Sequence, residues 1–321
     1  MSALLLAGTL PPGLEAVIAG GPFRGTPDGF RAIALSHVAD GCAGQASPDA
    51  PRCVERVVAR FRTLLTPWCR GRRCDVESLA AQADGLVLAH LGLALGAAHR
   101  AGGSCVDDAL HRAVAEALAA RSLEDPHGIA ASFRTSSLRW PADQGAVLAA
   151  LHRYDQGHGQ SLHIAPLERF RAAFPVESLP PSEATGRGPG ARFPRGCANA
   201  FLTRYLAEVD PARASAWWRH FVRDFEVRLP LGVEGFREWP RGVDQKADVD
   251  SGPIVFGVGT AASALAISAA RANGDLSRAR RLETAADQVL ALGVASSEAS
   301  STLALAIRFE ATWSHAQRGP E

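Results

Sequence analysis

The chain has 321 residues, of which 47% are hydrophobic, and its net charge is +1. This length supports a large buried core, and the near-zero charge excludes a strongly basic nucleic-acid-binding protein and an acidic tail protein. Only 7% of the residues are aromatic while alanine is abundant, which favours closely packed helices over a β-rich fold.

The first ten residues form a short apolar segment without a basic region. Two interpretations of this segment stay open, a trimmed signal peptide and a first packed segment of the fold. Four of the six cysteines cluster, at Cys42, Cys53, Cys69 and Cys74. An even number of cysteines permits disulfides in an oxidising compartment, and free buried thiols in a cytoplasmic protein are the alternative. The cluster favours a periplasmic or secreted location over a cytoplasmic one. No cysteine or histidine spacing is typical of a metal site, so no metal is expected.

Apolar residues recur every three or four positions along most of the chain, which predicts about eleven or twelve helices. One or two precede residue 42, and the others are expected at 53–65, 78–100, 106–121, 143–154, 166–174, 197–208, 211–227, 253–271, 276–292 and 300–317. The uncharged stretch 251–270 is long enough to span a bilayer, but its Gly, Ser and Thr residues favour a buried helix instead. We therefore expect no membrane span.

Three aromatic-proline motifs each precede an apolar stretch, and they lie about fifty residues apart. They are Trp140-Pro141, Phe193-Pro194-Arg195-Gly196 and Trp239-Pro240-Arg241-Gly242. This spacing is typical of a helical hairpin repeated around a ring, with apolar helices inside and amphipathic helices outside. The prediction is an all-α fold, a single (α/α)6-type toroid over residues 1–321. Segment 175–194, rich in Pro, Gly and Ser, is the only long loop expected, and folding over one mouth of the ring would suit it.

The densest group of reactive side chains lies just before the stretch 253–271. It combines four acids, two bases and a tryptophan: Glu238, Trp239, Arg241, Asp244, Lys246, Asp248 and Asp250. Asp250 or Ser251 would cap the following helix, with Pro253 in its first turn. Capping explains only one of the acids, so we expect a functional role for this segment. Lys246 is the only lysine in the chain.

A second group surrounds Asp143, which follows Trp140-Pro141 in the first turn of a predicted helix. Capping and function explain this acid equally well. In a toroid, Asp143 and Asp250 open onto the same mouth, as acid–base chemistry on a hydroxyl or glycosidic oxygen requires. Asp84 and His37 lie in or beside apolar stretches, where a helix-start acid and a core histidine are the simpler interpretations.

Residues 254–262 match the glycine pattern of a dinucleotide-binding loop, but no second strand follows. We expect the glycines to allow an inner helix to pack closely. The chain also lacks G-x-S-x-G, H-E-x-x-H and P-loop motifs. We therefore expect no cofactor.

Three segments together carry a family resemblance. They are Pro141-Ala142-Asp143 with the apolar run 146–151, Asp210-Pro211 with the aromatic residues that follow it, and Asp248-Val249-Asp250-Ser251-Gly252. In this order they resemble the linalool dehydratase/isomerase family of α/α-barrel proteins over about residues 140–290. The resemblance implies an α/α barrel, a central apolar cavity with acids at its mouth, a terpenoid-type substrate and export to the periplasm. The family's cysteine pair beside the Pro-Asp turn has no counterpart in 140–151.

These observations predict a cofactor-independent acid–base enzyme, a lyase or isomerase, acting on a hydroxylated, partly apolar small molecule. Asp143 and Asp250 would be acid and base, with Asp248 and Glu238 positioning them. The predicted substrate-binding residues are Trp140, Trp239, Asp84, His37, Arg195 and Lys246. A carbohydrate-active toroid enzyme (glycoside hydrolase or lyase) and a non-catalytic helical binding or scaffold protein are the alternatives. No nucleic-acid partner is expected, and a homo-oligomer is left open.

Overall fold

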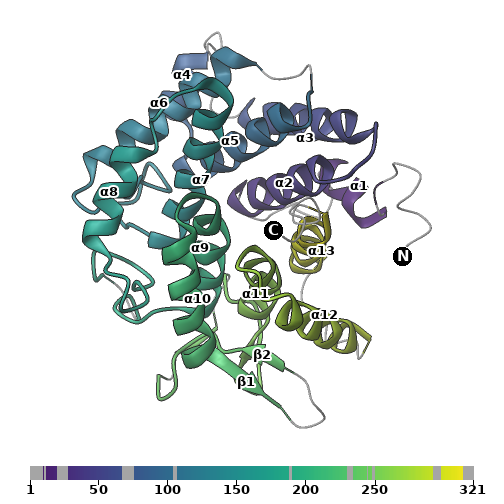
Figure 1. Cartoon of the computed structure of the whole chain (residues 1–321), viewed down its shortest axis with the longest axis vertical. Helices are drawn as coiled ribbons and strands as arrows, with labels where there is room; N and C mark the ends of the chain where they lie inside the picture. Colours follow the sequence, from purple (N-terminus) through teal and green to yellow (C-terminus); the bar gives the residue numbers. More distant parts are fainter. Residues whose placement is uncertain are drawn as a thin grey trace. The chain divides into compact units, whose positions relative to one another are not determined.

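The structure is a computed structural model that describes residues 10, 12–19, 28–66, 76–103, 107–187, 190–229, 234–243, 245–247, 250–291 and 298–313. These residues form thirteen α-helices and two small antiparallel sheets (Figure 1). The predominantly helical fold predicted from the sequence is confirmed. The chain divides into two compact units, and it passes between them several times.

The first unit comprises Met1–Ala120, Ala150–Leu162 and Glu298–Glu321. Its helices are α1 (Pro12–Ala19), α2 (Asp28–Ala43), α3 (Ala50–Leu65), α4 (Val76–Gln82), α5 (Gly85–Arg100), most of α6 (Asp108–Glu124), the end of α7 (Pro141–His158) and α13 (Glu298–Trp313). Helix α2 packs against α3, α5 and α13. Helix α5 is buried along nearly its whole length, whereas α3 buries one face, as the apolar and amphipathic patterns predict.

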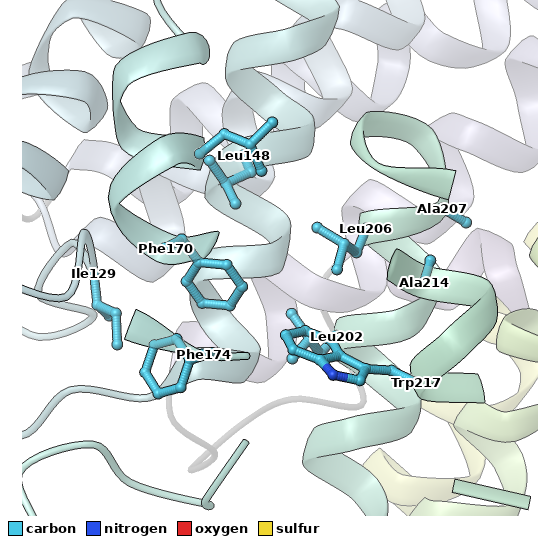
Figure 2. Close-up of a cluster of buried hydrophobic side chains, with 10 residues drawn as sticks. Ile129, Leu148, Phe170, Phe174, Leu202, Leu206, Ala207, Ala214 and Trp217 are labelled. Atoms are coloured by element: carbon cyan, nitrogen blue, oxygen red, sulfur yellow. The ribbon is translucent and has the colours of Figure 1, made fainter. Parts of the chain in front are cut away.

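The second unit comprises Arg121–Ala149 and His163–Ser297. Its helices are the start of α7, α8 (Ile164–Ala173), α9 (Gly196–Val209), α10 (Pro211–Phe225), α11 (Thr260–Ala272) and α12 (Leu276–Ala291). Helix α9 packs against α10 and α11, and α11 packs against α12. A core cluster joins α7, α8, α9 and α10, where the ring of Phe170 meets Trp217 edge to face at 6.1 Å between centroids (Figure 2).

Both sheets lie in the connection between α10 and α11. Strands β1 (Glu226–Arg228) and β2 (Glu234–Phe236) pair with Val227 opposite Gly235, and β3 (Ile254–Val255) and β4 (Val258–Gly259) pair with Val255 opposite Val258. The sequence predicted a helix from 253, which is wrong for 254–259. Phe256 and Gly257 have φ angles of 50° and 79°. Two successive residues in this left-handed region are incompatible with a right-handed helix, and they form a tight hairpin turn.

The hairpin changes other predictions. The N-cap of α11 is Gly259 rather than Asp250 or Ser251, and the apolar stretch after Trp239-Pro240 begins with the hairpin rather than with a helix. The loop 175–194 exists, but the connection between α10 and α11 is a second long one. The uncharged stretch 251–270 is divided between this hairpin and α11, and none of the described helices is long and apolar enough to cross a membrane.

The predicted helix 78–100 is two helices. Helix α4 ends at Gln82 and α5 begins at Gly85, because Asp84 between them has an extended backbone (φ −62°, ψ 140°). Asp84 is the N-cap residue of α5, as its simpler interpretation predicted. The start of α10 also follows the prediction, since Pro211 occupies its first turn and the Asp210 carboxylate accepts a hydrogen bond from the Arg213 N–H at 3.2 Å.

Two of the clustered cysteines form a disulfide that joins α2 to α3, between Cys42 and Cys53. Both therefore lie in helices, and Cys69 and Cys74 are outside the described residues. Cys197, at the start of α9, is a buried free thiol.

Candidate active site

Asp143 lies in the first turn of α7, where the sequence predicted it. Its carboxylate accepts a hydrogen bond from the hydroxyl of the buried Ser132 at 2.5 Å. Burial raises the pKa of Asp143 to about 6; the hydrogen bond from Ser132 opposes this rise, and the negative charge of Asp250 adds to it. Asp143 and Asp250, predicted as a pair, are therefore close enough to interact electrostatically.

Arg195 connects the residues of the acidic segment. It stands immediately before α9, and its Nε donates to Oε1 of the buried Glu238. Its Nη1 lies 3.9 Å from Oδ2 of Asp250, whose side chain is 61% exposed. The guanidinium also lies over the Trp239 ring, 5.4 Å from its centroid. One arginine thus contacts three of the residues selected from the sequence.

Glu238 is also held by Cys197, which the sequence analysis did not select. The Cys197 thiol donates to Oε1 of Glu238 at 3.0 Å, and its backbone N–H lies 3.4 Å from Oε2. Burial raises the pKa of Glu238, although Arg195 and Cys197 act in the opposite direction. Burial and the charge of Glu238 raise the pKa of Cys197 well above its ordinary value, so this side chain remains a thiol donor rather than a nucleophilic thiolate.

Two glycines let the backbone approach Glu238 closely. A Cβ on Gly196 would lie 2.0 Å from the carbonyl oxygen of Arg237, and the Gly196 N–H donates to the Glu238 carbonyl at 2.8 Å. A Cβ on Gly259 would lie 3.0 Å from Oε2 of Glu238. The start of α9 therefore lies against the backbone of residues 237 and 238, and the start of α11 lies against the Glu238 carboxylate.

Hydrogen bonds to Glu183 attach the loop 175–194 to the segment that precedes α7. Its carboxylate accepts hydrogen bonds from the backbone N–H groups of Arg139 and Thr185, both at 2.8 Å, and from the Thr185 hydroxyl at 2.7 Å. Partial burial alone would raise the pKa of Glu183, but these hydrogen bonds lower it overall. Further along the loop, a Cβ on Gly190 would lie 3.0 Å from the Trp239 ring. The loop thus contacts both the segment that precedes α7 and Trp239.

The remaining predicted residues fall into three groups. Trp140 packs edge to face on Phe133 at 5.7 Å between centroids, and Lys246 is exposed on the loop before Asp250. Asp248 lies outside the described residues. Asp84 and His37 belong to the first unit, where His37 is buried with its Nδ1 3.5 Å from Oε2 of Glu310.

Ser132 and Cys197 contact predicted acids of the site, and the sequence analysis did not select them. Cys197 directly follows the Phe-Pro-Arg-Gly motif, so its position after Arg195 was an available signal. Ser132 has no comparable signal, because only the folded chain brings it to Asp143. Among the described residues, no three His, Cys, Asp or Glu side chains are arranged to hold a metal ion.

Comparison with known proteins adds no relative to this description, since no protein-family model and no curated protein sequence matches the chain.

Proposed function

We propose that the protein is a cofactor-independent acid–base enzyme, a lyase or isomerase, acting on a hydroxylated, partly apolar small molecule. The observation that carries the proposal is that Asp143 and Asp250 interact electrostatically and lie in different environments. Asp143 is largely buried with a pKa of about 6, and Asp250 is exposed beside Arg195. A buried carboxyl group with a raised pKa is suited to act as the acid, and an exposed carboxylate is suited to act as the base.

In the proposed reaction, protonated Asp143 donates its proton to the hydroxyl group of the substrate. The carbon–oxygen bond breaks and water leaves, while the carboxylate of Asp250 accepts a proton from the adjacent carbon. The electron pair of that carbon–hydrogen bond forms the new double bond. Asp250 is exposed and returns its proton to solvent, and Asp143 is protonated again; the reverse sequence is hydration.

Arg195, Glu238 and Cys197 act as positioning residues in this proposal. Glu238 and the Trp239 ring fix the guanidinium of Arg195 from two sides, which holds its positive charge beside Asp250. The thiol of Cys197 in turn fixes Glu238. An arginine whose guanidinium is already held by other contacts loses little conformational entropy when it orients a carboxylate.

The proposal includes an α/α toroid related to the linalool dehydratase/isomerase family as the scaffold. Packing inside each unit supports it, since α2 packs on α3 and α5, and α9 packs on α10 and α11. Helices α2 and α9 therefore each contact their own hairpin partner and the first helix of a later hairpin. Small-angle scattering tests it: a closed ring gives the profile of one compact body, and two independently moving units give a more extended one.

A substrate panel tests the activity. Wild-type protein is incubated with tertiary and primary alkenols, with the corresponding dienes and with aryl glycosides, and products are identified by gas chromatography and sugar release. We expect alkenol dehydration that falls as pH rises through about 6, because the acid must be protonated. Asp143→Asn and Asp250→Asn should each lower turnover by about 100-fold or more.

Asp224→Asn is the matched control, since Asp224 is an exposed acid of the same unit that pairs with Arg223. It should leave turnover unchanged. Unchanged turnover in Asp250→Asn contradicts the assigned role. Release of sugar in place of alkene would establish the carbohydrate-active alternative, and no turnover of any compound favours the binding or scaffold protein.

A further inference from the structure

Phe256, at the turn of the β3–β4 hairpin, is an apolar side chain in an unfavourable position. Its side chain is 86% exposed, against 48% for the next most exposed large hydrophobic residue among those described. Its φ of 50° places a bulky residue in the left-handed region, which is rare and costs energy. The fold therefore holds this ring in water at the expense of backbone strain.

The base of this hairpin belongs to the candidate active site. The hairpin follows Asp250 directly, and its ends are joined by hydrogen bonds from the Ala261 N–H to the Ser251 carbonyl (3.1 Å) and from the Thr260 N–H to the Pro253 carbonyl (3.2 Å). On the returning strand, Gly259 lies against Glu238. The hairpin is thus fixed at the acids and carries Phe256 at its other end.

The hairpin is built so that its tip can change conformation at low cost. Each strand contributes two residues, and so short a two-stranded hairpin gains little stability of its own. Gly252 and Gly257 have φ angles of 60° and 79°, and glycine also adopts negative φ values readily. A movement of the tip would also release Phe256 from its left-handed conformation.

We propose that the β3–β4 hairpin is a lid and that Phe256 covers the apolar part of a substrate bound at Asp143 and Asp250. The identity of this substrate rests on the function proposed above. Closure buries the exposed ring against the hydrocarbon chain of the substrate, and it excludes water from the protonated Asp143. Phe256 is then a specificity-determining residue that favours substrates with an alkyl or alkenyl chain.

Binding of straight-chain 1-alkanols from butanol to decanol tests the lid without requiring turnover. Dissociation constants are measured by calorimetry for the wild-type protein, Phe256→Ala and Phe256→Gly. Phe193→Ala is the matched control, because Phe193 is another partly exposed phenyl group of the same unit. We expect affinity to rise with chain length in the wild type and in Phe193→Ala. Both Phe256 variants should weaken decanol binding by about 10-fold and leave butanol binding unchanged, because they remove the apolar contact area.

Hydrogen exchange gives a second measurement. Decanol should slow the exchange of the backbone amides of 254–259 in the wild type but not in Phe256→Gly. The lid is overturned if both Phe256 variants keep the wild-type dependence on chain length, or if the wild type binds no alkanol. Alkanol binding that depends on Phe256, without turnover of any panel compound, supports the lid while contradicting the acid–base function. Turnover that requires Asp250 but shows no effect of Phe256 on chain-length dependence contradicts the lid alone.

Discussion

The raised pKa of Asp143 lowers the free energy of unfolding at neutral pH, and this effect can be measured without knowing the substrate. Its pKa is about 6 in the folded protein and about 3.9 in an unfolded chain. Between these values the folded state holds a proton that the unfolded state releases, so stability falls as pH rises from 4 to 6 and stays lowered above 6. Asp143→Asn removes this cost and should raise the free energy of unfolding at pH 7 by about 1–3 kcal/mol.

Urea unfolding of both proteins at pH 4, 5, 6, 7 and 8 checks this expectation. The gain should be near zero at pH 4 and reach a plateau above pH 6. If the difference in the free energy of unfolding between the two proteins does not vary with pH, the substitution acts through packing rather than through ionisation. Asp224→Asn serves as the control, since the Arg223 hydrogen bond lowers the pKa of Asp224 and predicts a loss of stability instead.

Phe256 gives a second prediction at the level of one residue. Phe256→Gly removes the side chain from a left-handed position, and because the ring is exposed, little packing is lost. Thermal unfolding should show a gain of about 1 kcal/mol, the usual cost of an L-residue in this conformation. Gly257→Ala, at the neighbouring φ of 79°, should show a loss of similar size. A loss in both variants would contradict the strain attributed to Phe256.

At the level of elements, a buried ion pair joins α2 to α7. The two terminal nitrogens of Arg153 bind the two oxygens of the buried Asp40 at 2.6 and 2.9 Å, and Gly96 of α5 leaves room for the arginine side chain. Arg100 binds the same carboxylate at 3.0 Å, but its side chain is 43% exposed. The same acid therefore has a buried and a solvated partner, which form a matched pair for mutation.

Arg153→Met should destabilise the protein by about 3–5 kcal/mol in urea unfolding, because it leaves Asp40 with a buried charge that has lost its main partner. Arg100→Met should cost less than about 1 kcal/mol, as expected for a partly exposed ion pair. Adding Asp40→Leu to Arg153→Met should recover much of the loss. Equal effects of the two arginine substitutions would contradict the importance assigned to burial.

The elements that the sequence predicted well are those determined by local periodicity. Helix α9 was expected at 197–208 and occupies Gly196–Val209, because its apolar spacing and the Asp210-Pro211 junction are local signals. The hairpin at 254–259 was missed because strands of two residues contain no periodicity, and an apolar run next to a helix resembles its first turn. Nothing in the sequence marks Phe256 as left-handed.

The candidate site divides in the same way. Asp143 was predicted from its place in a helix start, which is local. Its hydrogen bond with Ser132 and the contact of Arg195 with Glu238 join residues 11 and 43 positions apart, and only tertiary packing brings these together. Sequence therefore predicted individual reactive residues, while their partners and the resulting change in the pKa of Asp143 required the structure.

At the scale of the whole molecule, the two units contain buried groups that respond to acid in opposite directions. In the first unit, burial and the neighbouring His158 and His99 lower the pKa of His111 to about 3, and burial lowers the pKa of His90 well below its ordinary value. These histidines are neutral when folded and take up protons when unfolded. In the second unit, Asp143 keeps its proton more readily when folded.

The sign of each effect follows from linkage. A histidine with a lowered folded pKa costs stability as pH falls below about 6.5, by about 1.4 kcal/mol per pH unit for His111 until its pKa of about 3 is reached. Over the same interval from pH 6.5 to 5, Asp143 restores stability to the second unit. Hydrogen exchange should therefore show weaker protection of α5 and α6, which carry His90 and His111, at pH 5 than at pH 7 once intrinsic rates are corrected. Protection of α9 should be equal or stronger at pH 5.

His111→Asn separates this mechanism from a general effect of acid. Asparagine does not titrate, so the variant should lose less protection between pH 7 and 5 in α6, the helix that carries His111, while its α9 amides behave as in the wild type. A uniform decrease across both units would mean that they open together and that the buried histidines do not act locally. Opposite changes would show that each unit responds to its own buried ionisable groups, which would let acidity weaken the first unit while the protonated form of Asp143 accumulates in the second.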